Sequence, residues 1–85
     1  MLHGRLLSYL DEVARAGSIR KAAERLNVSP TAVNRQILQL EEMLDVQLFQ
    51  RLPRGMKLTA AGEALLTHVR QTLRDYRTLE SRLED

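Results

Sequence analysis

Side chains with well-defined hydrogen-bonding geometry gather on one face of a predicted helix. The helix is expected to begin at Ser29 and Pro30, because serine is a favoured N-cap and proline suits the first helical position. Its exposed face then carries Thr31, Asn34 and Arg35. Arginine binds guanine O6 and N7 or a phosphate, asparagine matches adenine N6 and N7, and threonine contacts a thymine methyl or a phosphate. This pattern predicts a helix that reads base edges in the major groove of DNA.

Other polar and basic residues extend the predicted contact surface. Arg54 lies at the tip of a predicted hairpin and suits a narrow minor groove, whereas Arg51 and Lys57 suit phosphates, the alternative being that they contact nothing. Arg20 lies near the start of the preceding helix, where that helix would cross the DNA backbone, and Gln36 flanks the reading face. The candidate DNA-binding residues are therefore Arg20, Ser29, Pro30, Thr31, Asn34, Arg35, Gln36, Arg51, Arg54 and Lys57.

The helices that position this face are predicted from apolar residues three or four positions apart. The first helix has an apolar stripe at Leu6, Tyr9, Leu10, Val13 and Ala14. Gly17 is expected to end it in the left-handed conformation, and Ser18 to cap a short second helix that ends at Leu26. Asn27 then forms a tight left-handed turn before Ser29. Two short helices joined by such a turn are typical of a helix-turn-helix.

A two-stranded hairpin is predicted after the third helix. That helix is expected to end at Asp45 and to bury one apolar face, which consists of Val33, Ile37, Leu40 and Leu44. An extended segment follows from residue 46, and the residues Pro53-Arg54-Gly55 form a turn before a second strand over 56–58. An isolated hairpin is marginal in water, so it must pack on the helices through Leu48, Phe49 and Leu58.

The last predicted helix begins after the capping residue Thr59 and contains no proline up to Asp85. Its apolar stripe, with spacings of four and three, consists of Leu65, Val69, Thr72, Tyr76, Leu79 and Leu83. Because the stripe continues to the last turn, we expect these residues to form a homodimer interface; the alternative is a helix folded back on its own domain. Residues 1–58 are thus expected to form a DNA-binding domain and residues 59–85 a linker and dimerisation helix.

Length, composition and charge set the class of protein. Eighty-five residues make one small domain, and the absence of cysteine excludes disulfides and thiolate metal sites. The first residues carry acids where an export signal needs an apolar block, and no apolar run reaches the roughly 18 residues that span a membrane. We therefore expect no export signal and a cytoplasmic location. Residues 46–58 hold three basic side chains and no acid, which favours a polyanionic partner. A solvated face with a mild basic excess is the alternative.

Residues that could support catalysis are scattered. His3 and His68 lie far apart without partners at metal-ligand spacing, and the adjacent Glu41 and Glu42 are expected to form a solvated helix end. Neither a glycine-rich phosphate loop nor a nucleophile motif is present, so we expect neither an enzyme nor a cofactor. A protein-docking domain built on the same scaffold is a further alternative. Leu38, on the reading face, would suit docking, whereas the basic residues there suit DNA.

An ordered set of short motifs resembles the DNA-binding domain of LysR-type transcriptional regulators. The matching segments are Gly17-Ser18-Ile19, Lys21-Ala22-Ala23, Leu26-Asn27-Val28-Ser29, Ala32-Val33, Arg35-Gln36-Ile37, Leu40-Glu41-Glu42, Leu48-Phe49, Arg51 and Leu58-Thr59-x-x-Gly62. The resemblance implies a winged helix-turn-helix, that is, three helices and a two-stranded wing, followed by a dimerisation helix. It also implies a dimeric, sequence-specific regulator that binds double-stranded DNA.

The sequence departs from the family pattern at three positions. Pro30 stands where the family often has glutamine, Asn34 where it often has serine, and Asp45 where glycine is usual. The first two side chains would face DNA, so target preference does not carry over from other members. The resemblance implies an effector-binding domain in full-length members, and these 85 residues contain none of it. Whether the chain is part of a longer regulator or a stand-alone relative is left open.

Overall fold

Four helices and one antiparallel hairpin make up the computed structural model, which describes residues 4–84. In chain order the elements are α1 Gly4–Ala16, α2 Ile19–Leu26, α3 Pro30–Leu44, β1 Phe49–Leu52, β2 Gly55–Leu58 and α4 Ala60–Glu84. In the hairpin, Phe49 pairs with Leu58 and Leu52 with Gly55. The mainly helical fold with a two-stranded wing is the one predicted, while His3 and Asp85 lie outside the described residues.

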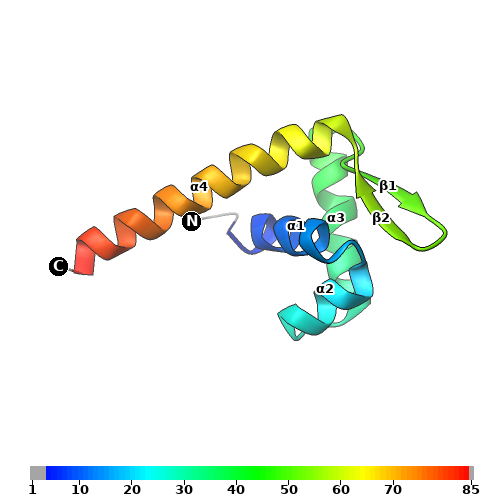
Figure 1. Ribbon diagram of the computed structural model, residues 1–85, viewed down its shortest axis with the longest axis horizontal. Helices are drawn as coiled ribbons and strands as arrows, with labels where there is room; N and C mark the ends of the chain where they lie inside the picture. The colour runs from blue at the N-terminus through cyan, green and yellow to red at the C-terminus, as the bar shows by residue number, and fades with distance from the viewer. Residues whose placement is uncertain (1–3, 85) are drawn as a thin grey trace.

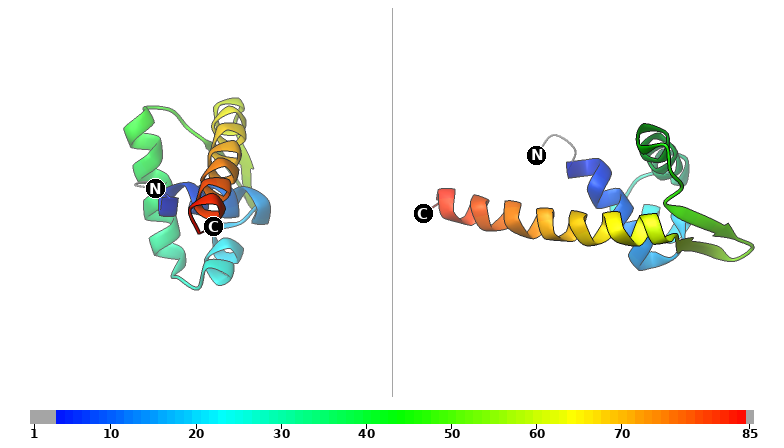
Figure 2. Two further views of the ribbon diagram at one scale, coloured as in Figure 1. Left: turned by 90° about the vertical axis from the view of Figure 1, so that its left-hand side faces the viewer. Right: turned by 90° about the horizontal axis from the view of Figure 1, so that it is seen from above.

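Helix α1 lies at the centre of the arrangement, where it contacts α2, α3, α4 and strand β2 (Figure 1). The hairpin projects from one end of the molecule, and α4 runs from the base of the hairpin toward the opposite end. Figure 2 shows that the C-terminal half of α4 extends past the other helices. The molecule is consequently elongated, with a longest dimension of 48 Å against 26 and 19 Å.

The ends of the helices follow the predicted capping signals. Gly17, Asn27 and Asp45 have φ angles of 68°, 58° and 52°, so each helix before them ends in the left-handed region. Asn and Asp tolerate this conformation better than most residues, which explains how Asp45 replaces the glycine usual in the family. Three hydroxyl caps each accept a backbone N–H from three residues further along: Ser18, Ser29 and Thr59.

The core combines one face of each helix with the first residues of the hairpin. Its buried members are Leu6, Leu10, Val13, Ala22, Ala23, Val33, Ile37, Leu40, Leu48, Phe49, Leu66 and Val69. The hairpin packs as predicted, through Leu48, Phe49 and the half-buried Leu58. The prediction for Leu44 was wrong, because α3 ends at this residue and its side chain is 46% exposed at the rim of an apolar groove.

The first turns of α4 belong to this core. Leu66 and Val69 are 4% and 1% exposed and pack against the rest of the domain. Val69, which the sequence predicted to lie in a dimer interface, is thus already covered by its own chain. The core also crosses the boundary drawn between residues 58 and 59, so α4 both completes the domain and extends beyond it.

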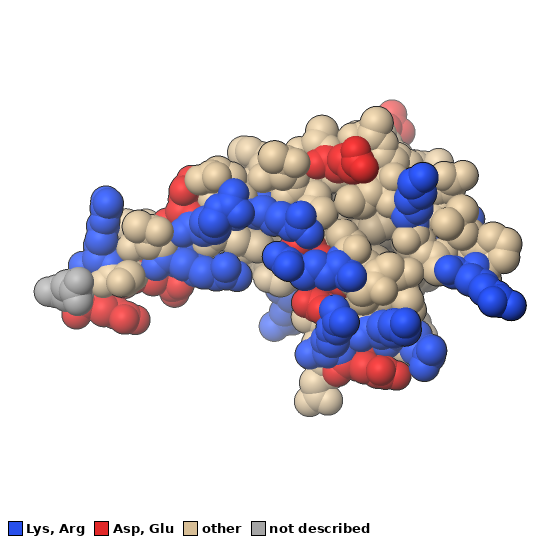
Figure 3. All heavy atoms as spheres, in the orientation of Figure 1, with Lys and Arg blue, Asp and Glu red and all other residues tan. Residues whose placement is uncertain are grey.

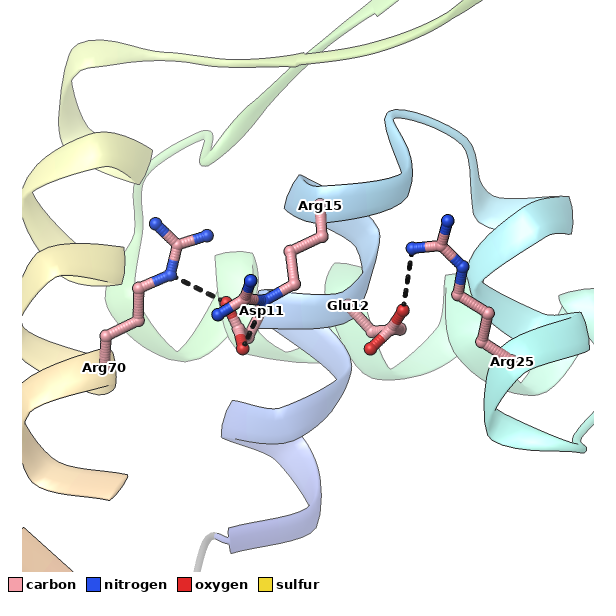
Figure 4. Close-up of polar contacts among 5 residues, drawn as sticks. All are labelled: Asp11, Glu12, Arg15, Arg25 and Arg70. Atoms are coloured by element: carbon pink, nitrogen blue, oxygen red, sulfur yellow. Dashed lines mark hydrogen bonds and ion pairs between the residues drawn. The ribbon is translucent and has the colours of Figure 1, made fainter. Parts of the chain in front are cut away.

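Ion pairs join α1 to the neighbouring helices α2 and α4 (Figure 4). Asp11 accepts hydrogen bonds from Arg70 of α4 at 2.8 Å and from Arg15 at 3.1 Å. Glu12 pairs with Arg25 of α2 at 3.1 Å. Burial by itself would raise the pKa of Asp11, but the hydrogen bonds and positive charges of the two arginines outweigh it and hold that pKa below its ordinary value of 3.8.

A carboxylate with a lowered pKa contributes stability that depends on pH. Above pH 4 or so Asp11 is ionised in both states and its arginine contacts stabilise the fold, and this contribution is lost as the pH falls through the lowered folded-state pKa. Asp11→Asn should cost about 1 kcal/mol at neutral pH. Urea unfolding from pH 7 to 2 should show the variant and the parent converging below about pH 4. Asp75→Asn, on the exposed part of α4, is the control, and an identical pH profile for both variants would contradict the assignment.

Candidate nucleic-acid interface

The exposed face of α3, referred to below as the α3 face, forms a shallow open hollow. Its lining residues are Thr31, Asn34, Arg35, Leu38, Gln39 and Glu42. Ser29 and Pro30 are exposed at the N-terminal end of the helix, as predicted for residues at the start of a reading helix. Gln36 is half-buried and does not line this hollow, so Gln39 takes the flanking place. Hydrogen-bond donors occupy the first turns, and Glu42 places an acid at the far end.

One hydrogen bond joins the α3 face to the hairpin. The Arg51 guanidinium on β1 donates to Asn34 Oδ1 at 2.7 Å, across 17 positions of sequence. The guanidinium stays exposed while Asn34 is half-buried. Arg51, which was predicted to contact a phosphate, and Asn34, which was predicted to read a base, are thus in direct contact. Their separation in sequence did not indicate this contact.

The tip of the hairpin packs on the turn between α1 and α2. The Met56 N–H donates to the Gly17 carbonyl at 3.0 Å, and a side chain at Gly55 would collide with that carbonyl. Arg54 thereby joins Arg20 and Lys21 in lining a second hollow. Arg20 also contacts Glu24 at 3.4 Å, but both side chains are largely exposed, so this pair is weak. Three cations from α2 and the hairpin therefore gather in one place.

Basic side chains extend along α4, over α1 and α2 and to the tip of the hairpin, with acidic side chains between them (Figure 3). The hairpin differs from α4 in its balance of charge. Arg51, Arg54 and Lys57 are all exposed, and residues 46–58 contain no acid to compensate them. A negatively charged ligand would consequently meet an uncompensated basic surface at the hairpin.

Glu41 has a structural role that the sequence did not reveal. Its carboxylate accepts the backbone N–H groups of Leu48 at 2.8 Å and of Phe49 at 3.3 Å. The expectation of a solvated helix end is therefore wrong for Glu41, although Glu42 is exposed as expected. The carboxylate reaches across the turn after α3 and sets where the hairpin begins. A carboxylate one turn before a helix end, followed by a short extended segment, is the only signal the sequence offers.

The predicted dimer stripe on α4 divides into two parts. Its first half packs within the chain, with Leu65 and Thr72 half-buried and Val69 covered. Its second half is solvent-exposed, since Tyr76 is 37%, Leu79 51% and Leu83 76% exposed. An apolar groove between α1, α3 and α4 adjoins the first half and is lined by Leu6, Leu7, Leu40, Met43, Leu44, Leu65, His68, Val69 and Thr72.

Residues 4–84 show neither a membrane-spanning helix nor a cluster of metal ligands. No helix within residues 4–84 combines the length and the apolar content that crossing a membrane requires. Within that range, too, His, Cys, Asp and Glu side chains do not cluster in threes as metal ligands would.

The geometry defines the class of protein. A short helix, a tight left-handed turn and a second helix with donors on its outer face form a helix-turn-helix, and the basic hairpin beside them is its wing. The chain is therefore a winged helix-turn-helix domain. Residues 5–63 match the family described as "Bacterial regulatory helix-turn-helix protein, lysR family", and the chain belongs to that family.

The matches to curated relatives cover most of this chain but only part of each relative's own length. The HTH-type transcriptional regulator YofA of Bacillus subtilis (strain 168) is 51% identical over 67 residues, which are 79% of this chain and 24% of YofA. ClcR of Pseudomonas putida is 46% identical over 69 residues, which are 81% of this chain and 24% of ClcR. The chain thus spans about a quarter of the length of these relatives.

Solved structures show the same fold. The structure described as the CbnR_DBD–DNA complex has a TM-score of 0.91 and 41% identity, and the match covers 95% of this chain and 93% of that one. The BenM_DBD/benA site 1 DNA complex has a TM-score of 0.91 and 31% identity, with 95% and 91% covered. The likeness includes α4, because it covers nearly the whole described chain.

The contact between Glu41 and the hairpin predicts that replacing Glu41 lowers the stability of the fold more than replacing the adjacent Glu42 does. Glu41→Ala should leave two partly buried N–H groups without a partner and cost about 1–3 kcal/mol of unfolding free energy. Glu42→Ala, which removes an exposed carboxylate from the same helix end, should change stability by less than about 0.5 kcal/mol. Urea unfolding and amide hydrogen exchange at Leu48 and Phe49 measure both. Equal stability of the two variants, with unchanged exchange, would rule out this role.

Proposed function

We propose that this chain is the double-stranded DNA-binding domain of a LysR-type transcription regulator that acts on its target in the cytoplasm. The observation that carries the proposal is the α3 face, whose donors lie beside an acid-free basic wing. Helix α3 would enter the major groove while the wing approaches the adjacent minor groove. The function is binding rather than catalysis, in keeping with relatives named as transcriptional regulators.

The exposed residues divide into base-reading and phosphate-binding groups. Arg35 and Thr31 lie on the first turns of α3, where side chains reach base edges, and Arg35 suits the two acceptors of guanine. Arg20, Lys21 and Arg54 surround one hollow that suits the phosphate backbone and the edge of the minor groove. The CbnR_DBD and BenM_DBD structures contain DNA, and the similarity of this fold to theirs supports the assignment.

The test of this proposal is duplex binding measured as a function of salt. If about four to six phosphates are neutralised per protomer, log affinity should fall against log salt with a slope of about −4 to −5. Arg35→Ala should weaken binding to a selected site by about 1–3 kcal/mol and blur one base position. Arg82→Ala, at the far end of α4, is the matched control. Affinity that does not change with salt would count against DNA binding, and an equal Arg35→Ala loss on all sequences would make Arg35 a phosphate contact.

We also propose that two copies associate through the exposed end of α4. Tyr76, Leu79 and Leu83 continue one stripe of the helix past the part that the domain covers, and all three are exposed. Full burial of a large apolar side chain contributes roughly 1.5–3 kcal/mol, so such stripes on two copies can offset the entropy of association. A two-fold dimer would present two α3 helices to symmetric half-sites on one side of the DNA.

Substitutions that introduce negative charge into the exposed stripe are expected to give a monomer that stays folded. Leu79→Asp together with Leu83→Asp should abolish association, and operator affinity should fall because the second half-site acts through effective concentration. Thr78→Asp with Ser81→Asp adds the same charge on the opposite side of α4 and should leave the dimer intact. Sedimentation at tens of micromolar distinguishes these variants. If the parent chain sediments as a monomer, the dimer proposal is wrong, whereas the proposal of DNA binding is unaffected.

A further inference from the structure

The bond between Arg51 and Asn34 connects the wing to the α3 face at a residue that the sequence predicts to read a base. Among the described residues it is the only hydrogen bond between a side chain of α3 and a side chain of the hairpin. Its N···O distance of 2.7 Å is that of a charge-assisted bond. Arg51 is exposed and Asn34 half-buried, so the contact lies at the surface of the domain.

The chemistry of the two groups decides how the Asn34 amide is turned. A guanidinium has five N–H donors and no acceptor, so only the amide oxygen can face Arg51. The amide nitrogen then keeps its two N–H donors for another partner. A bidentate contact with adenine needs both ends of the amide, because the oxygen must accept from N6 while the nitrogen donates to N7. In this structure one lone pair of that oxygen already accepts from the Arg51 guanidinium, whose positive charge and N–H groups also disfavour the approach of a second donor such as adenine N6.

We propose that Arg51 is a positioning residue that makes Asn34 a hydrogen-bond donor toward DNA. Asn34 then selects a base whose major-groove edge carries acceptors and no donor, namely guanine or thymine, and disfavours adenine. The inference rests on the proposed function, since it specifies what the same α3 face reads. It replaces the adenine contact suggested by the type of residue alone.

The surroundings of Asn34 agree with this polarity. Arg35 follows Asn34 on the same face, and Arg51 brings a guanidinium into contact with Asn34 itself, so this part of the surface offers mainly donors. The nearest acid on the face is Glu42, two helical turns further along. The exocyclic amino group of an adenine would meet donors here, whereas guanine O6 and N7 or thymine O4 would meet complementary groups.

The experiment is selection of bound sequences from a random duplex pool at fixed salt, with the 85-residue chain and its variants. The parent should select guanine or thymine at one position of the site. Asn34→Ala should remove the preference at that position, with a loss of roughly 3- to 10-fold in discrimination between bases. Arg51→Ala frees the amide oxygen, so the preference at that same position should move toward adenine. In an Asn34→Ala background, Arg51→Ala should no longer change the base preference.

Lys57→Ala is the matched control, because it removes an exposed cation of the wing that has no bond to Asn34 among the described residues. It should weaken binding to all sequences and leave the base preference unchanged. An adenine preference in the parent, or an Arg51→Ala pattern that matches the Lys57→Ala pattern, would overturn the inference while DNA binding stands. Failure to bind any duplex would overturn both. Circular dichroism of each variant verifies that the domain remains folded.

Discussion

The backbone of residues 47–49, where the chain leaves α3 and enters the wing, must satisfy its hydrogen bonds beside the buried core. Glu41 accepts the N–H groups of Leu48 and Phe49, and Thr59 donates its own N–H to the Leu48 carbonyl at 3.0 Å. The Thr59 hydroxyl donates to the Gln47 carbonyl at 2.7 Å. Unpaired polar backbone groups in such a place would be costly, so these bonds fix α3, the wing and α4 to one another.

Close packing at Gly62 adds a second constraint at the same point. A side chain here would collide with the Leu48 carbonyl, so only glycine lets the first turn of α4 lie against the segment that enters the wing. Leu66 and Val69 then complete the core, and the pair between Arg70 and Asp11 sets the direction of the helix against α1. The proposed reading surface and the proposed dimer helix are therefore held in one fixed relation. That relation would determine the spacing of two half-sites on DNA.

The reading surface combines a braced side chain with freely exposed ones. Asn34 is half-buried and held by Arg51, whereas Arg20 and Arg54, which are proposed to meet the phosphate backbone and the edge of the minor groove, are exposed. Directional hydrogen bonds require fixed geometry, while contacts with phosphates tolerate movement. The family scaffold can thus be kept while target preference changes, because Pro30 and Asn34 alter the side chains on the surface and leave the core residues in place.

The sequence by itself determined the elements and most of the core of this protein. Local signals sufficed for the caps at Ser18 and Ser29 and for the left-handed turn at Asn27, because each acts within one helical turn. Apolar spacing gave the faces of the helices, but it could not show where burial ends. Leu44 was misassigned for this reason, and the burial of Val69 within its own chain was not foreseen, since exposure depends on which other segments lie nearby.

Only the tertiary structure decided how distant polar groups pair. Arg51 meets Asn34 across 17 positions, and Arg70 meets Asp11 across 59. Arg54 reaches Arg20 and Lys21 because the wing packs on the turn before α2. Charge and hydrogen-bonding capacity are properties of single residues and can be read from the sequence. The direction in which a side chain presents them is set by its neighbours in space, and the proposed base preference of Asn34 depends on that direction.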